Sequence, residues 1–532
     1  MASQDIYIVL DSPVYSTGEL AEVYIVSHAS VEEELEVEFR DYKGIFSKAS
    51  IKLEPGVNVV YTLEYQTPRI PGRYEIKLVS GSRLLDSVKY IVYGDTLESI
   101  DRYVVLTWHH HQAPGYLPNG RYRYTWAFKH VVDEELASYG RGPYHYHAVI
   151  LEKYRDYKCT YNLSPSLLAQ WHQLITRGVQ LENGEWIPSN SKTAELVLET
   201  LELYRKSVER GQIDVLTSIY AHTIGGFLVD YLGMNDIVRD EVAFGIEVTR
   251  SIIGVEPRGI WTPEMAFSMK MIDIYSELGL EYTVLDGKCH FTGSQGDKSG
   301  HLEPYIARGG HGEIIVFFRD TDLSNHLSFK NNFKNEAQAW RAAYELAYLI
   351  TEKTRMGGVL TIALDGENWM IFASNPPLTA FYYDKLVEYL VKIQSKNYFE
   401  TSNHREIINK YSAKRILTHI PTTTWLCGFT KWNGEVRRQP HYWEKARKTY
   451  QELRNYEEKH GRDEYSQRAR WALWHALDSD YWWAEFWDPT YIDTWLCEVQ
   501  RHLLEGERVK NNFSKTAQLT IEECLEQAIT GE

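Results

Sequence analysis

Two acidic residues follow closely after apolar, strand-like runs. Val359–Leu364 is a continuous apolar stretch rich in β-branched residues, typical of a strand buried on both faces of a parallel sheet, and Asp365 follows it directly. A shorter apolar run ends at Trp261, three residues before Glu264. Side chains just past the carboxyl ends of parallel strands point into the functional mouth of α/β folds, so both carboxylates are expected to face one cavity. Two such carboxylates, each near a tryptophan, are the groups that hydrolysis of a sugar acetal requires.

Each residue taken alone also allows a structural interpretation. Asp365 could cap the following helix, since Asp is a preferred N-cap residue, and Glu264 could lie in a solvated loop. The occurrence of two matching sites favours catalysis. Retaining glycosidases hold their carboxyl groups about 5–5.5 Å apart and inverting ones roughly 6.5–9.5 Å, and the sequence gives no distance that would decide between them.

The elements that position these residues alternate between strand and helix from about residue 100. Such alternation predicts parallel strands joined by right-handed crossovers. Seven strands are expected, which suits a closed or nearly closed barrel: Tyr103–Thr107, Lys158–Asn162, Ile213–Ser218, Gly259–Trp261, Tyr282–Leu285, Ile314–Phe318 and Val359–Leu364. Helical patterns lie between many of them, at Lys192–Arg210, Asp236–Ile253, Ser268–Leu278 and Asn335–Lys353. Polar residues recur just after several of the strands, which indicates that these strands open onto one site.

The chain is expected to form three domains, at residues 1–97, 98–415 and 416–532. The first shows short strands separated by turn signals such as Pro71-Gly72, which predict an immunoglobulin-like β-sandwich. Its expected strands are Ile6–Leu10, Ala21–Ser27, Leu35–Phe39, Val59–Leu63, Arg73–Val79 and Val88–Tyr93. The last domain is expected to be helical, with helices at Tyr442–Lys459, Glu464–Ser479 and Tyr491–Glu507. The barrel is therefore the predicted catalytic domain of an α/β protein. Packing is the expected role of the sandwich, and contact with a glycan is the alternative.

Composition limits the classes of partner. The chain of 532 residues contains 16 Trp and 38 Tyr, which suit stacking on sugar rings or a bulky core. A formal net charge of −16 argues against nucleic acid and membrane surfaces as partners, but permits a neutral glucan. Five scattered cysteines predict neither a zinc framework nor a secreted disulfide scaffold, and leave a single bridge open. Without a signal-peptide or membrane-span pattern, a cytoplasmic location is expected.

The histidine triplet at residues 109–111 raises the question of a metal. Neighbouring residues of a strand point to opposite faces, so only His109 and His111 share one. Two histidines without a placed third ligand are a weak metal signal. Neutral imidazoles that hold sugar hydroxyls explain the pair equally well. We therefore predict no metal and no cofactor, and retain a metal-dependent carbohydrate enzyme as an alternative that chelation would test.

Five separated segments resemble, in order, the motifs of glycoside hydrolase family 57. They are His109–Pro114, Gly211–His222, Ile260–Phe267, Ala363–Trp369, and a last region made of Trp432–Glu435, Trp443 and Asp478–Trp483. The resemblance covers roughly residues 100–500 and looks closest to the amylopullulanase and α-amylase branch. It implies a (β/α)7 barrel followed by a helical domain, retention of anomeric configuration and no obligatory metal. The chain departs from the motifs at Ala113, at Tyr481 where a Trp is usual, and in a last segment that is one residue shorter.

The resemblance implies that Glu264 is the nucleophile and Asp365 the general acid/base of a retaining glycoside hydrolase. The expected substrates are α-glucans such as starch, glycogen and maltodextrins, with pullulan a further candidate. The expected substrate-binding residues hold hydroxyls or offer stacking faces: His109, His111, His222, Trp261, Trp432, Asp480 and Trp483. A packed aromatic core is the alternative for the tryptophans. The alternative functions are a 4-α-glucanotransferase or branching enzyme with the same site, and a catalytically silent glucan-binding protein.

Overall fold

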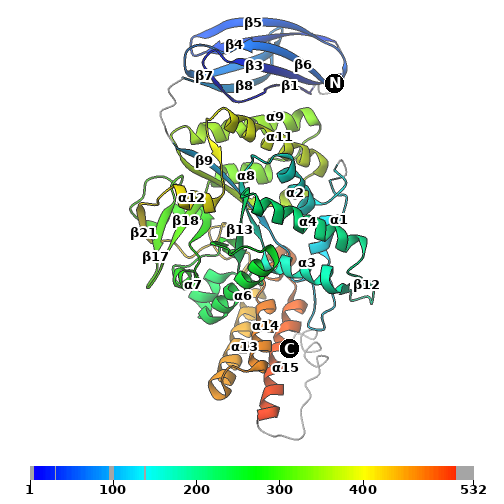
Figure 1. Cartoon of the computed structure of the whole chain (residues 1–532), viewed down its shortest axis with the longest axis vertical. Coiled ribbons are helices and arrows are strands. Elements are labelled where there is room, and N and C mark those ends of the chain that lie inside the picture. Colours follow the sequence, from blue (N-terminus) through cyan, green and yellow to red (C-terminus); the bar gives the residue numbers. More distant parts are fainter. Residues whose placement is uncertain (1–4, 30–31, 95–100, 137–138, 511–532) are drawn as a thin grey trace.

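The computed structural model describes residues 5–29, 32–94, 101–136 and 139–510, and it has three parts in the predicted order (Figure 1). A β-sandwich stands at one end, a group of helices at the other, and a barrel lies between them. The predicted boundary at residues 97 and 98 lies outside the described residues. The predicted boundary at residue 415 falls on strand β21 (Arg415–His419), which pairs with β17 (Tyr305–Arg308) beside the barrel.

Seven parallel strands close into the barrel, as predicted. They follow the order β15-β14-β13-β10-β9-β19-β18, and β18 pairs again with β15 to complete the circle. Their bounds are β9 (Arg102–His110), β10 (Cys159–Leu163), β13 (Ile213–Ser218), β14 (Gly259–Trp261), β15 (Tyr282–Asp286), β18 (Glu313–Arg319) and β19 (Gly358–Asp365). Every residue of β10 and β13 is buried, because helices cover the outer face and side chains fill the interior.

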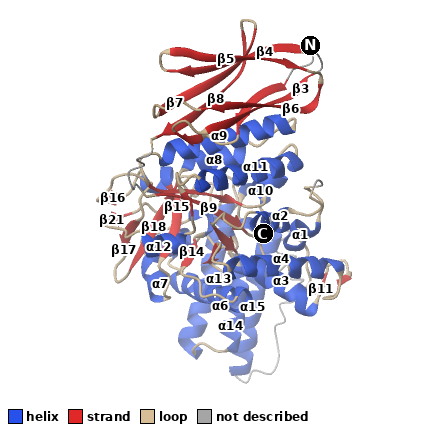
Figure 2. Cartoon of the chain, turned by 45° about the horizontal axis from the view of Figure 1, so that its top comes forward, coloured by secondary structure: helices blue, strands red, loops and turns tan. Residues whose placement is uncertain are grey.

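Helices pack around much of the barrel, while strands β17 and β21 lie at its edge beside β18 (Figure 2). The longer ones are α2 (Pro143–Lys153), α3 (Pro165–Arg177), α4 (Lys192–Glu209), α6 (Asn235–Ile253), α8 (Thr321–Phe329), α9 (Glu336–Thr354) and α11 (Pro376–Ser395). The shorter ones are α1 (Trp126–Val132), α5 (Gly225–Phe227), α7 (Met271–Glu277), α10 (Asn368–Ile371) and α12 (His404–Lys410). Polar caps start several of them: the side chains of Ser191 and Asn335 accept backbone N–H groups at the beginnings of α4 and α9. None of the described helices is long and apolar enough to cross a membrane.

The N-terminal domain is a sandwich of a three-stranded and a five-stranded sheet, with the orders β1-β3-β6 and β2-β8-β7-β4-β5. The strands are β1 (Asp5–Leu10), β2 (Val14–Ser16), β3 (Leu20–Ala29), β4 (Glu33–Asp41), β5 (Gly44–Leu53), β6 (Gly56–Gln66), β7 (Gly72–Ser80) and β8 (Arg83–Tyr93). The sequence did not predict β2 and β5. β2 is very short, and β5 is an edge strand whose mostly exposed side chains lack the alternation of a half-buried strand.

The sandwich rests on α9 and α11 of the barrel (Figures 1 and 2). The Tyr344 hydroxyl of α9 donates to the carbonyl of Lys89 at 2.8 Å, and the Tyr389 hydroxyl of α11 donates to that of Leu10 at 3.0 Å. Both tyrosine rings are buried. The sandwich therefore packs against the outer helices of the barrel, in agreement with its predicted packing role.

Three helices form the C-terminal part: α13 (Gln439–His460), α14 (Glu464–Ala476) and α15 (Pro489–Lys510). Arg470 on α14 ties this part to the barrel. Its guanidinium donates to Glu457 on α13 and to Asp236 on α6, both at 2.6 Å. Trp443 on α13 stacks on Trp482 with ring centres 3.6 Å apart. The segment between α14 and α15, residues 477–488, is thereby held against the barrel and carries part of the site.

Candidate active site

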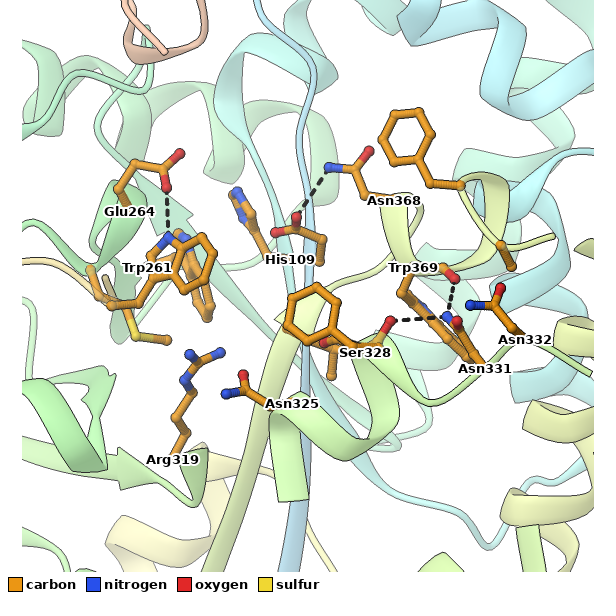
Figure 3. Close-up of a pocket in the computed structure, with 17 residues that line it drawn as sticks. His109, Trp261, Glu264, Arg319, Asn325, Ser328, Asn331, Asn332, Asn368 and Trp369 are labelled. Carbon is orange, nitrogen blue, oxygen red and sulfur yellow. Dashed lines mark hydrogen bonds between the residues drawn. The ribbon is translucent and has the colours of Figure 1, made fainter. Parts of the chain in front are cut away.

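The two predicted carboxylates line the same cavity. β19 ends at Asp365, and its register places Asp365 opposite His109 on β9. β14 ends at Trp261, and Glu264 follows on the turn η2 (Pro263–Met265). A cavity of about 260 Å³ is lined by all four of these side chains (Figure 3). This volume is slightly below the roughly 300–1,000 Å³ of typical small-molecule pockets.

Glu264 occupies an unusual backbone conformation. Its φ is 55°, in the left-handed region that non-glycine residues rarely adopt. Five non-glycine residues of the described part have positive φ, and four of them, Glu264, Met265, His222 and Cys427, belong to this site or to the loop beside it. Each such residue costs on the order of 1–3 kcal/mol and persists only where the surroundings enforce it. The backbone around Glu264 is therefore held by its neighbours.

The environment of Glu264 opposes its ionisation. Burial raises the pKa of Glu264 to about 8, and the negative charges of Asp365 and Asp480 add to this effect. One contact acts in the opposite direction: the indole Nε1–H of Trp425 donates to Glu264 Oε2 at 2.8 Å and lowers the pKa. A carboxylate that attacks as a nucleophile must be ionised, so this hydrogen bond favours the reactive form.

Asp365 is more open than Glu264. Solvent in the cavity reaches its side chain, although protein encloses the cavity. The enclosing protein and the charge of Asp480 raise the pKa of Asp365, while the Asn368 amide, which donates to Asp365 Oδ2 at 3.0 Å, lowers it. Helix α10 receives no side-chain cap, so the capping role considered for Asp365 is wrong. Two carboxyl groups with raised pKa values therefore line one cavity, and each holds its proton to higher pH than an isolated carboxyl group would.

Three histidines form a parallel stack beside the carboxylates. The rings of His111 and His222 lie 3.8 Å apart at 14°, and His109 lies between His222 and Trp261, 5.0 and 4.7 Å from them. Burial lowers the pKa of His109 to about 3 and that of His222 well below its ordinary value. Both rings are therefore neutral and can donate or accept a hydrogen bond. His109 lines the cavity, and the other two histidines lie behind it.

Asp480 joins this stack from the C-terminal part, on the turn η4 (Ser479–Tyr481). Its carboxylate lies 3.3 Å from His111 Nε2 and 3.8 Å from His222 Nδ1. Ligand atoms of these three residues lie within 4.8 Å of one another, so they are the set that could hold a cation. Both nitrogens of His222 already have partners, however, at Ser479 Oγ and His109 Nε2. We therefore assign hydrogen bonding to this cluster, and the absence of a metal stays a prediction.

His110 points away from the cavity, as strand alternation predicts. The Tyr204 hydroxyl donates to the carbonyl of Tyr144, so it must accept from His110 Nε2, which lies 3.1 Å away. His110 Nδ1 is then an acceptor, and it faces Glu367 Oε2 at 3.5 Å. Burial raises the pKa of Glu367 well above its ordinary value. Glu367 is therefore a neutral, buried carboxylic acid directed toward His110, although it lies only two residues from Asp365.

The tryptophans predicted to contact substrate differ in their exposure. Trp261 lines the cavity. Trp483 is half-buried and lies parallel to Trp425, with ring centres 6.3 Å apart. Trp432 is completely buried and packs edge-on against Trp483. It has no face to offer a sugar, so its predicted stacking role is replaced by packing behind Trp483.

Sequence reasoning missed Trp425, which lines the cavity and contacts Glu264. No motif pointed to it, because it lies in the segment between β21 and α13. The sequence did point to Arg319, because this residue begins the polar segment at the end of β18. Further polar and aromatic residues complete the wall of the cavity: Asn325, Asn331, Asn332, Asn368, Phe329 and Phe372. Their amides offer hydrogen bonds to hydroxyl groups and their rings offer apolar faces.

The family model of glycosyl hydrolase family 57 matches residues 105–422, which include both carboxylates and most of the cavity wall. The chain belongs to this family. That assignment confirms the resemblance seen in the sequence. The match ends before the C-terminal helices that contribute Asp480.

Individual relatives in the family are distant. A 4-alpha-glucanotransferase of Thermococcus litoralis is 26% identical over 149 residues, which are 27% of this chain and 20% of that protein. An alpha-amylase of Pyrococcus horikoshii is 22% identical over 269 residues, 50% of this chain and 38% of that protein. The chain thus spans less than two fifths of the length of either relative.

The fold agrees with solved structures. A branching enzyme of this family from Thermococcus kodakaraensis superposes with a TM-score of 0.55 at 15% identity, covering 80% of this chain and 94% of that one. The 4-alpha-glucanotransferase of Thermococcus litoralis gives 0.54 at 16% identity, covering 77% of this chain and 60% of that one. At such identities the likeness concerns the fold alone.

Proposed function

We propose that the protein is a retaining glycosidase that acts on α-glucans, with Glu264 as nucleophile and Asp365 as general acid/base. The observation that carries this proposal is the pair of carboxylates on one cavity, Glu264 held by Trp425 and Asp365 open to solvent. The related alpha-amylases and 4-alpha-glucanotransferase support α-glucan as the substrate class.

In the first half-reaction, Glu264 attacks the anomeric carbon while Asp365 protonates the departing glycosidic oxygen. The raised pKa of Asp365 favours the protonated form that this step needs. The Trp425 indole N–H, which donates to Glu264 Oε2, holds the attacking carboxylate in place. The result is a covalent glycosyl-enzyme and a shortened glucan.

In the second half-reaction, Asp365 removes a proton from water, and the resulting hydroxide releases the sugar from Glu264. Because Asp365 faces the cavity, water can reach it from the side that the first product has left. The neutral ring of His109 lines the cavity beside the cleavage point, with its two nitrogens held by Asn162 Oδ1 and His222 Nε2. Two inversions give net retention of configuration.

Separate incubations with maltoheptaose and with pullulan test this proposal, with Glu264→Gln as the control. Shorter sugars and new reducing ends, absent with the variant, would support hydrolysis and the role of Glu264. No change in either substrate would contradict the α-glucan assignment. The relation to amylopullulanases is supported only if pullulan is cleaved.

Transfer to a second glucan is the competing outcome, because the same covalent intermediate can react with a sugar hydroxyl. The relatives include a 4-alpha-glucanotransferase, which is the observation that favours it. Products longer than maltoheptaose with little gain in reducing ends would assign the protein to this activity. Branch points in the product, detected by a debranching digest, would separate the two kinds of transfer.

A further inference from the structure

The loop that carries Trp425, residues 423–428, is attached to both sides of Glu264. The backbone N–H of Trp425 donates to the carbonyl of Glu264 at 3.2 Å, and that of Phe267 donates to the carbonyl of Thr423 at 3.2 Å. These bonds place the Trp425 loop against the turn that bears the nucleophile. The indole Nε1–H then reaches Glu264 Oε2 at 2.8 Å.

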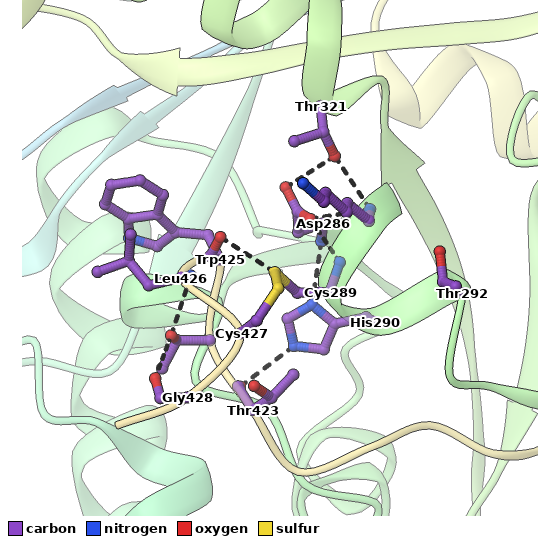
Figure 4. Close-up of a disulfide and its surroundings, with 12 residues drawn as sticks. Asp286, Cys289, His290, Thr292, Thr321, Thr423, Trp425, Leu426, Cys427 and Gly428 are labelled. Atoms are coloured by element: carbon purple, nitrogen blue, oxygen red, sulfur yellow. Dashed lines mark hydrogen bonds between the residues drawn. A yellow bond between two sulfur atoms is a disulfide. The ribbon is translucent and has the colours of Figure 1, made fainter. Parts of the chain in front are cut away.

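A disulfide joins the same loop to the barrel. Cys427 is bonded to Cys289 across 138 residues of chain (Figure 4). Cys289 lies on η3 (Gly287–Phe291), a single turn after β15. The next residue, His290, accepts the backbone N–H of Asp286 at Nδ1, so its Nε2 donates to the carbonyl of Thr423 at 3.2 Å. The turn η3 therefore holds both ends of the Trp425 loop.

The turn η3 is itself fixed by the barrel. Asp286 accepts the backbone N–H of Cys289 at 2.8 Å and the Nε–H of Arg319 at 2.7 Å, and both side chains of this ion pair are buried. The Arg319 guanidinium also lies 5.8 Å from the centre of the Trp425 ring. A continuous set of contacts thus runs from β15 and β18 through the disulfide to the indole that touches Glu264.

We propose that Trp425 is a positioning residue for the Glu264 carboxylate, and that the Cys289–Cys427 disulfide keeps it in place, so that full activity requires the oxidised pair. This inference rests on the proposed function for its catalytic consequence. It goes beyond that function by naming the residues that position Glu264. Cys427 has a φ of 60°, a conformation that a free chain would leave when the bond opens. Opening the bond therefore frees the segment between Trp425 and Gly428 to move the indole from Glu264.

Several titratable or charged groups face Glu264 or Trp425. They come from the loop after β13, from β18 and β19 and from the C-terminal part, and are His222, Arg319, Asp365, Asp478 and Asp480. The charges of Asp365 and Asp480 oppose ionisation of Glu264, and the Trp425 indole favours it. Loss of the indole N–H is therefore expected to move the ionisation of Glu264 to higher pH.

The first experiment compares Trp425→Phe with Trp186→Phe. Phenylalanine retains an aromatic ring but has no donor, and Trp186 is an exposed tryptophan on the short strand β12 (Trp186–Ile187), so it serves as a matched control. We expect kcat/KM to fall roughly 10- to 100-fold for Trp425→Phe, as for loss of a hydrogen bond to a charged group. The acidic limb of the pH–rate profile should move to higher pH. An unchanged profile, or an equal effect of Trp186→Phe, would overturn the proposal.

The second experiment reduces the disulfide in the folded protein. Dithiothreitol supplies two electrons and two protons, the S–S bond breaks into the thiols of Cys289 and Cys427, and the reagent closes into its cyclic disulfide. The reduced enzyme should show the same upward shift of the acidic limb as Trp425→Phe. The double variant Cys289→Ser/Cys427→Ser should match it and not respond to the reagent. Full activity of the reduced enzyme with an unshifted profile would overturn the proposal.

A readout that needs no substrate separates this proposal from the proposed function. The indole N–H resonance of Trp425, assigned by its loss in Trp425→Phe, should titrate with pH in the wild-type protein and not in Glu264→Gln. It should also change on reduction. If the resonance neither titrates nor changes on reduction, the positioning role of Trp425 is overturned even if glucans are cleaved. If the resonance changes as expected but the protein is inactive, only the proposed function is contradicted.

Discussion

Glu264 and Asp365 line one cavity but are held in opposite ways. Glu264 lies on a turn with left-handed backbone, accepts an indole N–H and is flanked by a disulfide-bonded loop. Asp365 ends a strand, faces the solvent of the cavity and receives one side-chain hydrogen bond, from Asn368. A nucleophile must lie at bonding distance from one carbon, whereas an acid/base must exchange its proton between turnovers. The difference in support therefore corresponds to the proposed division of roles.

The largest effect is expected for the nucleophile. Glu264→Gln removes the group that forms the covalent intermediate, so kcat/KM on maltoheptaose should fall by about 10⁴-fold or more. In Glu264→Ala, whose shortened side chain leaves room beside the anomeric carbon, added azide should attack the α-linked substrate from the vacated side and give a β-glycosyl azide. Formation of the α-azide would contradict the assignment of Glu264.

A smaller loss that depends on the leaving group is expected for the acid/base. Asp365→Asn should cost about 10²–10⁴-fold on a glucan, because the departing oxygen needs a proton. An α-glucosyl donor with an acidic phenol as leaving group should lose much less. Azide should restore turnover here with retention, giving the α-azide. Equal losses for both kinds of substrate would refute the role of Asp365.

The buried environment of Glu264 should also be visible in stability. Its pKa is about 8 in the folded protein and near the ordinary glutamate value when unfolded, so its favourable contribution is present at pH 4 and is lost as pH rises through about 8. Relative to the wild type, Glu264→Gln should therefore raise the free energy of unfolding at pH 9 by on the order of a few kcal/mol, and hardly at pH 4. Denaturant titrations at both pH values measure this. The exposed Glu209, substituted in the same way, is the control and should show no such difference.

A modest effect is expected at Asn368, which donates a hydrogen bond to Asp365. Asn368→Ala removes a hydrogen bond that lowers the pKa of Asp365, so the acid should stay protonated to higher pH. The alkaline limb of the kcat/KM profile should move upward, with a change of only several-fold at the optimum. A downward shift would mean that Asn368 acts on Asp365 in another way.

The smallest effect is expected for Glu367, which lies two residues from Asp365. Glu367 is neutral and turned toward His110, so Glu367→Gln preserves its charge state and most of its shape. Its kcat/KM should remain within about threefold of wild type. A loss comparable to that of Asp365→Asn would show that the proton of Glu367 takes part in the reaction. Asp365 would then not be the only proton donor near the cleavage point.

Much of this arrangement could be predicted from the sequence, because local pattern determines it. The apolar runs gave all seven barrel strands, and alternation along β9 separated His109 and His111 from His110. The contact between Trp425 and Glu264 could not be predicted. It joins residues 161 positions apart through a loop without regular structure, and depends on how that loop is tied to η3. The cysteine count left one bridge open without indicating its partners.

The roles of the aromatic residues could likewise not be predicted from the sequence. Trp432 and Trp483 lie in similar aromatic-rich segments, yet one is completely buried and the other is half-buried beside Trp425. Which ring keeps an accessible face is decided by the packing of the C-terminal helices on the barrel. Residue type and spacing are the same for a packing ring and a stacking ring.

Trapping the intermediate tests the central claim most directly. A 5-fluoro-α-maltosyl fluoride should react to form a slowly hydrolysed glycosyl-enzyme, and peptide mapping by mass spectrometry should place the label on Glu264. The Glu264→Gln protein should remain unlabelled. A label on Asp365, or turnover of the reagent with inversion and no labelled protein, would contradict the assignment of Glu264 as the nucleophile of a retaining enzyme.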